Sequence, residues 1–138
     1  MTYNTARPRV IIADDHAEMV KVAATLLGKE FDIVATAHDG RSALDCIRRL
    51  DPDIALLDLY MPGMTGLEVI KVLHGSGART VFAIMTGYSD SDLGRAAIDA
   101  GAMAFVTKAR LNDDLLEALR SVVQGIVFVS KDSIPKKG

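Results

Sequence analysis

Short apolar runs alternate with amphipathic segments along this chain, and this alternation limits the accessible folds more than any other feature. Five apolar runs are strand candidates: residues 10–13, 33–37, 53–57, 80–85 and 102–106. Most of them are continuously apolar, a pattern typical of parallel strands that are covered on both faces. An amphipathic segment follows each run. A strand followed by a helix, five times over, predicts a parallel sheet with helices on both faces.

The amphipathic segments carry recognisable helix boundaries, mostly capping residues at the start and glycine or proline at the end. The predicted helices are residues 17–28, 40–50, 66–74 and 91–100, and a fifth that lies between Asn112 and Gly125. The fourth helix contains Gly94. Because glycine lowers helix stability, we expect this helix to be the least rigid.

The length of 138 residues fits one domain, and 49% hydrophobic with 25% charged residues is a globular composition. A formal net charge of −2 gives no bulk attraction to nucleic acid or to an anionic membrane. Cys46 is the only cysteine, which excludes an internal disulfide. Neither a signal peptide nor a membrane span is recognisable, so we expect a cytoplasmic protein. We divide the chain into an N-terminal extension (1–8), the domain (9–130) and a polar tail or linker (131–138).

Polar residues follow four of the five predicted strands. Asp14 and Asp15 follow the first strand, Asp58 the third, Thr86 the fourth and Lys108 the fifth. In open α/β sheets, ligands bind at the carboxyl ends of the strands, where the strand order reverses. If the order is the flavodoxin-like 2-1-3-4-5, the first and third strands are neighbours and their carboxylates meet in one crevice. In isolation, Asp14 and Asp15 would be interpreted as helix caps.

Three adjacent carboxylates repel one another unless a cation lies between them. Oxygen ligands favour Mg²⁺, which also binds phosphate oxygens. A carboxylate beside Mg²⁺ can act as a nucleophile and become an aspartyl phosphate. Lys108 would supply positive charge, and Thr86 a hydroxyl donor, to the phosphoryl oxygens. The set therefore predicts phosphoryl transfer with Mg²⁺ as the cofactor.

Four stretches carry these residues: IIADDH (11–16), LLDLYMPGMTG (56–66), MT (85–86) and AGAMAFVTK (100–108). Together they resemble the receiver domains of two-component response regulators, over residues 9–130. The DDH opening and the stretch ALRSVVQG (118–125) are most similar to the NarL/FixJ subfamily. The resemblance implies an α/β fold, a flavodoxin-like, doubly wound sheet of five parallel strands in the order 2-1-3-4-5 with five helices.

The resemblance also implies a role for each acidic residue. Asp58 would be the phosphoacceptor. Asp15 would bind Mg²⁺ directly and Asp14 through a bound water, with the backbone carbonyl of Tyr60 as the third protein ligand. We expect His16 only to begin the first helix, without a metal role.

Three further residues would act on the phosphoryl group or respond to it. Thr86 and Lys108 would hold it, and Phe105 would be a switch aromatic whose rotamer changes with Thr86. From the residues alone, an aromatic side chain in an apolar strand is equally well a core residue. Family members often have a proline with a cis peptide after the lysine. Here Ala109 follows Lys108, and a cis bond before alanine costs about 3 kcal/mol, so we expect a trans bond.

Two tyrosines are predicted at the rim of the same pocket. Tyr60 and Tyr88 lie two residues after Asp58 and Thr86, respectively. Their rings would hinder the water that hydrolyses an aspartyl phosphate, and so set the lifetime of the phosphorylated state. The alternative is a pair of exposed aromatic residues that serve a partner interface.

The leading hypothesis is a signalling switch that receives phosphate from the phosphohistidine of a sensor histidine kinase or phosphotransfer protein. Phosphorylation would change partner binding, with a homodimer as one candidate, and the domain would bind neither nucleic acid nor membrane. It would catalyse only its own phosphorylation and dephosphorylation. One alternative is an aspartate-nucleophile phosphatase. Such enzymes need a second aspartate as general acid two residues after the nucleophile, and this chain has Tyr60 at that position. The other is a pseudo-receiver, which would usually have lost an acidic residue or the lysine.

Overall fold

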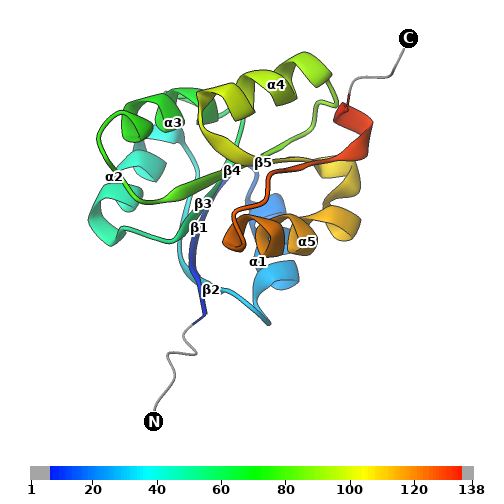
Figure 1. The fold of residues 1–138 in the computed structure, drawn as a ribbon. Helices are drawn as coiled ribbons and strands as arrows, with labels where there is room; N and C mark the ends of the chain where they lie inside the picture. The colour runs from blue at the N-terminus through cyan, green and yellow to red at the C-terminus, as the bar shows by residue number, and fades with distance from the viewer. Residues whose placement is uncertain (1–6, 135–138) are drawn as a thin grey trace.

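A parallel β-sheet forms the middle of three layers in the computed structural model, which describes residues 7–134 (Figure 1). Within this range the strands are β1 (Arg9–Ala13), β2 (Asp32–Ala37), β3 (Ile54–Asp58), β4 (Val81–Thr86), β5 (Ala102–Thr107) and β6 (Phe128–Val129). Their order is β2-β1-β3-β4-β5-β6, and every neighbouring pair is parallel. The predicted order 2-1-3-4-5 is confirmed, with β6 added beside β5.

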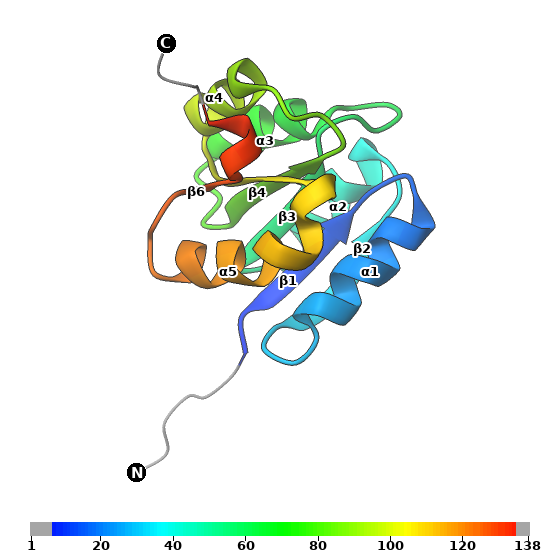
Figure 2. The same cartoon turned by 90° about the vertical axis from the view of Figure 1, so that its right-hand side faces the viewer.

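Helices cover both faces of the sheet (Figure 2). They are α1 (Ala17–Leu27), α2 (Gly40–Leu50), α3 (Gly66–His74), α4 (Ser91–Ala100) and α5 (Leu111–Val123), with 3₁₀-helices η1 (Lys108–Arg110) and η2 (Lys131–Ser133). Helices α1 and α5 lie on one face, and α2, α3 and α4 lie on the other. The predicted fold class is therefore confirmed.

Each strand sends alternate side chains into two separate apolar cores. In β1, Ile11 and Ala13 belong to the core shared with α2, α3 and α4, whereas Val10 and Ile12 belong to the core shared with α1 and α5. All positions of β3 are buried. Burial of one large aliphatic side chain stabilises a fold by about 1.5–3 kcal/mol. The central strands therefore form a rigid base for the residues at their carboxyl ends.

The loop after β3 is fixed by a close backbone approach and a helix cap. A Cβ at Gly66 would lie 2.5 Å from the carbonyl oxygen of Asp58, so only glycine allows this approach. Thr65 caps α3: its hydroxyl accepts a hydrogen bond from the Glu68 backbone N–H at 3.1 Å, and the Glu68 carboxylate accepts one from the Thr65 N–H at 3.0 Å. These contacts hold the loop that follows Asp58 against the sheet.

The region after Gly125 is more structured than the sequence pattern predicts. Residues 126–130 carry no predicted element, yet Phe128–Val129 form β6. Lys131–Ser133 form η2 inside the predicted tail, whereas residues 135–138 of that tail and 1–6 of the N-terminal extension lie outside the described residues. Within the described range, no helix combines the length and hydropathy needed to cross a lipid bilayer.

Helix α4 runs through Gly94 without a break. Gly94 is buried, and a Cβ added there would lie 3.5 Å from the ring of Phe105 on β5. The absence of a side chain thus lets α4 pack directly on this ring. The lower rigidity expected for α4 stays a prediction.

Candidate functional site

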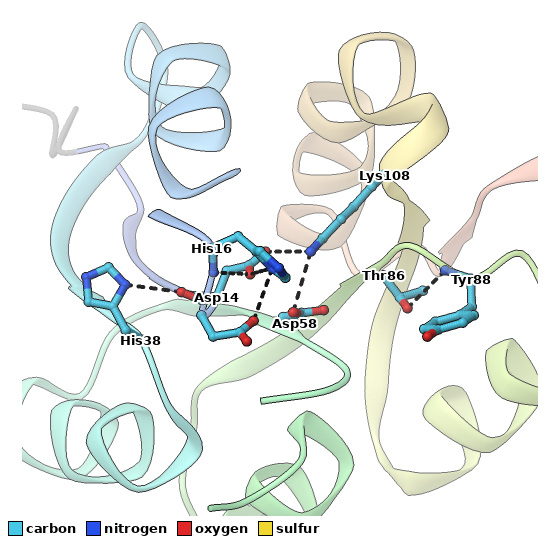
Figure 3. Close-up of polar contacts among 8 residues, drawn as sticks. Asp14, His16, His38, Asp58, Thr86, Tyr88 and Lys108 are labelled. Carbon is cyan, nitrogen blue, oxygen red and sulfur yellow. Dashed lines mark hydrogen bonds and ion pairs between the residues drawn. The ribbon is translucent and has the colours of Figure 1, made fainter. Parts of the chain in front are cut away.

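An open pocket of about 690 Å³ lies at the carboxyl ends of β1, β3, β4 and β5. Its lining comprises Asp15, His16, Met19, Asp58, Tyr60, Thr86, Gly87, Tyr88 and Lys108. The side chain of Asp14 is fully buried next to it. The structure thus brings together the acidic, hydroxyl and lysine side chains that sequence analysis selected from four separate strands (Figure 3).

Lys108 bridges the two most buried carboxylates of the site (Figure 3). Its Nζ lies 2.7 Å from Oδ2 of Asp14 and 3.4 Å from Oδ2 of Asp58. Asp14 also accepts a hydrogen bond from the His16 backbone N–H at 2.9 Å. Since the Lys108 side chain is only 17% exposed, water screens this attraction weakly. The lysine is therefore aimed at Asp58 by its pairing with Asp14.

The two buried aspartates have opposite pKa shifts. Burial and the charge of Asp14, only partly offset by Lys108, raise the pKa of Asp58 to about 6. Burial would also raise the pKa of Asp14, but hydrogen bonds from Lys108 and the His16 backbone outweigh it and lower that pKa. Asp14 is thus ionised first, and its charge makes ionisation of Asp58 costly.

The same residues can hold a divalent cation. Oxygen or nitrogen atoms of Asp14, Asp15, His16 and Asp58 all lie within 4.8 Å of one another. The three carboxylates are hard oxygen donors, as Mg²⁺ prefers. The raised pKa of Asp58 reflects its burial and then a repulsion from Asp14 that a cation would relieve. The donor set therefore fits Mg²⁺.

Thr86 and Phe105 lie on neighbouring strands but differ in surroundings. Thr86 is fully buried at the end of β4, and its hydroxyl accepts a hydrogen bond from the Tyr88 backbone N–H at 3.2 Å. Phe105 is fully buried in the core that includes α4.

Within the described residues all peptide bonds are trans, including the one between Lys108 and Ala109.

Tyr60 and Tyr88 meet at the mouth of the pocket. Their rings pack edge to face, with centroids 5.4 Å apart and planes at 85°. Both residues line the pocket and are 50% and 60% exposed, so the predicted shielding and the alternative of a partner interface are both still open.

Two histidines beside the site carry contacts that the sequence pattern did not indicate. Nδ1 of His16 lies 3.2 Å from carboxylate oxygens of both Asp14 and Asp15, so the expectation of a plain helix-start residue was incomplete. Nδ1 of His38 lies 3.2 Å from the backbone carbonyl of Asp14. Sequence analysis selected no residue after the second predicted strand. The position of His38 directly after β2 was the one available signal.

Comparisons with known proteins agree with this arrangement. Residues 10–120 match the sequence model of a family described as response regulator receiver domain. The nitrate/nitrite response regulator protein NarP of Escherichia coli K12 is 40% identical over 119 residues, which are 85% of this chain and 55% of NarP. The transcriptional regulatory protein DesR of Bacillus subtilis 168 is 30% identical over 118 residues, 84% of this chain and 58% of DesR. The chain thus spans little more than half the length of these relatives.

Solved structures share the same fold. A two-component response regulator of the LuxR family from Aurantimonas sp. SI85-9A1 superimposes with a TM-score of 0.87 at 27% sequence identity. The superposition covers 93% of each chain. The likeness therefore extends over nearly the whole described structure.

Proposed function

The chain belongs to the receiver domains of two-component response regulators, which act as phosphorylation-dependent signalling switches, and on this premise we propose that Asp58 is its phosphoacceptor. The relatives are consistent with the NarL/FixJ subfamily. One observation carries the proposal: Lys108 bridges Asp58 and the buried Asp14 at the base of an open pocket. A buried carboxylate next to a lysine and a hydroxyl, in a pocket that a donor can enter, has what a phosphoryl acceptor needs.

The phosphoryl donor is the phosphohistidine of a sensor histidine kinase or phosphotransfer protein. An Asp58 carboxylate oxygen attacks the phosphorus and forms a P–O bond. The P–N bond breaks, and the leaving imidazole nitrogen keeps the electron pair and takes a proton. Negative charge spreads over the three equatorial oxygens in this reaction. The Lys108 ammonium and the Thr86 hydroxyl stabilise that charge.

Asp14, Asp15, Asp58 and the backbone carbonyl of Tyr60 would hold Mg²⁺. When bound, Mg²⁺ supplies positive charge that neutralises the carboxylates and phosphoryl oxygens. Asp58 must be ionised to attack phosphorus. Because its pKa is raised to about 6 by burial and Asp14, it is mainly ionised at pH 7.5 even before the cation contributes.

The domain turns over no separate substrate in this proposal and changes its affinity for a partner, including a second copy of itself. It works in the cytoplasm, where histidine kinases draw on ATP. The matched region is little more than half of each of these relatives, so their outputs are not carried over to this chain.

Intact-mass measurement after incubation with acetyl phosphate and Mg²⁺ tests the proposal. The parent should gain one phosphoryl group, and Asp58→Asn should gain none. Asp45→Asn is a matched control, because Asp45 is an exposed aspartate on α2, and it should label like the parent. Full labelling of Asp58→Asn would show that another residue is the acceptor.

A further inference from the structure

A polar cluster fastens residues 126–134, here called the C-terminal segment, to the end of β5. The Thr107 hydroxyl donates a hydrogen bond to the Asp132 carboxylate, with oxygen distances of 2.8 and 3.0 Å. The Thr107 backbone N–H donates to the Ser130 hydroxyl at 3.2 Å. Ser130 in turn donates to Asp114 of α5 at 2.7 Å. The cluster therefore joins the segment to both β5 and α5.

Three members of the cluster are shielded from water, whereas Asp132 is exposed. Thr107, Ser130 and Asp114 are each at most 5% exposed. Arg110 satisfies Asp114 with hydrogen bonds of 2.9 and 3.2 Å, so the buried carboxylate is paired. Hydrogen bonds that are buried and fully paired specify one arrangement, because breaking one leaves a polar group without a partner.

Apolar packing contributes to this attachment at Phe128 and Val129, which pack against the two cores of the domain, but not at the ends of the segment. The side chains of Ile126, Val127 and Ile134 are 54%, 47% and 51% exposed. A groove of about 600 Å³ lies between α4 and part of the C-terminal segment. Strand β6 is only two residues long. The polar cluster and the hydrogen bond from the Ser130 N–H to the Phe105 carbonyl at 2.9 Å thus hold the segment together with the packing of Phe128 and Val129.

The attachment point is next to the phosphoryl-binding groups. Thr107 directly precedes Lys108 in the chain and pairs with Thr86 in the β4–β5 register. A phosphoryl group on Asp58 would occupy space beside Asp58 Oδ2, where Lys108 Nζ now lies at 3.4 Å. Lys108 must then change its position, and its backbone is joined directly to Thr107, the residue that holds the segment.

We propose that the C-terminal segment is an internal latch on the β5 edge, closed in the unphosphorylated protein and released when Asp58 carries a phosphoryl group. The proposal rests on the phosphoacceptor role of Asp58. Release uncovers the backbone edge of β5 beside Phe105 and the floor of the groove along α4, so it couples the pocket to a surface on the side of the molecule. Coupling between two sites is reciprocal, so a weakened latch should strengthen binding in the pocket.

Hydrogen exchange of the full chain, followed by mass spectrometry, tests the latch. Beryllofluoride with Mg²⁺ serves as the phosphoryl mimic. Amides of residues 126–134 should exchange about tenfold faster with the mimic, while those of residues 86–88 become more protected. Protection at 86–88 with unchanged or slower exchange at 126–134 overturns the latch and leaves the phosphoacceptor role intact. If neither region responds and acetyl phosphate does not label Asp58, both proposals fail.

Two variants test the cluster itself. Thr107→Val keeps the shape of the side chain but removes its hydroxyl, and Asp132→Ala removes the acceptor. Both should exchange quickly at residues 126–134 without the mimic, and calorimetry should find beryllofluoride bound about fivefold more tightly, the lower range of allosteric coupling. Asp45→Ala, which also removes one exposed carboxylate, should match the parent. Parent-like exchange and affinity in both cluster variants would refute the latch.

Discussion

Replacement of Asp58 by asparagine should stabilise the metal-free protein. Asp58 is 4% exposed, and burial together with Asp14 raises its pKa from 3.8 to about 6. The carboxylate is therefore less stable in the folded chain than in the unfolded one. A shift of this size corresponds to about 3 kcal/mol in the free energy of unfolding at pH 7.5. Asparagine has nearly the same shape and no charge, so Asp58→Asn should recover most of that cost.

The sign of the pH dependence follows from the direction of the shift. Between pH 3.8 and about 6 the folded state holds a proton that the unfolded state has lost, so this group lowers the stability of the parent as pH rises. The advantage of Asp58→Asn should be about 3 kcal/mol at pH 7.5 and about 1 kcal/mol at pH 4.5. Because Mg²⁺ relieves the same repulsion, it should stabilise the parent more than Asp58→Asn.

Urea unfolding followed by circular dichroism measures these differences. Asp45→Asn on the exposed side of α2 is the control and should stay within about 0.5 kcal/mol of the parent at every pH. The reasoning is refuted if Asp58→Asn is no more stable than the parent at pH 7.5. A gain of the same size at both pH values would also refute it, because the gain would then have another cause than charge.

Three further predictions concern the phosphorylated and metal-bound states. The double variant Tyr60→Asn, Tyr88→Glu should lose phosphate about tenfold faster than the parent, or about 1.4 kcal/mol in barrier height, because polar side chains would admit and orient the attacking water. The decay of labelled phosphoprotein at constant Mg²⁺ is the measurement, and an unchanged or slower decay would contradict shielding by the edge-to-face pair. Beryllofluoride should shift backbone NMR signals across α4, β5 and α5 as Phe105 and Thr86 rearrange; shifts limited to the pocket lining would count against this. Mg²⁺ affinity should fall about tenfold between pH 7.5 and pH 5, because Asp58 must release a proton to bind the cation. Calorimetry at several pH values measures this affinity, and an affinity that does not change with pH would contradict the prediction.

The fold and most of the site could be predicted because both depend on short-range sequence patterns. A continuously apolar run such as residues 54–57 marks a central parallel strand, and the residue after such a run lies at the ligand-binding edge. Asp58 was found in this way. Its role as a phosphoacceptor was inferred because the predicted strand order places Asp14 and Lys108 close to it.

Other features depend on contacts that no local pattern reveals. Strand β6 is too short to give a periodicity, and Ser130 and Asp132 are polar residues whose partners lie 16–25 positions away. Gly94 was interpreted as a weak point of α4, whereas the structure gives it a packing role against Phe105. The contacts of His16 and His38 depend on side-chain orientation. Such features follow from tertiary packing.

Identification of the phosphorylated residue is the most direct test of the central claim. An aspartyl phosphate is an acyl phosphate, and borohydride reduces it to homoserine. The parent chain would be incubated with acetyl phosphate and Mg²⁺, reduced, digested and sequenced by mass spectrometry. We predict homoserine at position 58 alone. Homoserine at Asp14 or Asp15 with intact aspartate at position 58 would contradict the account.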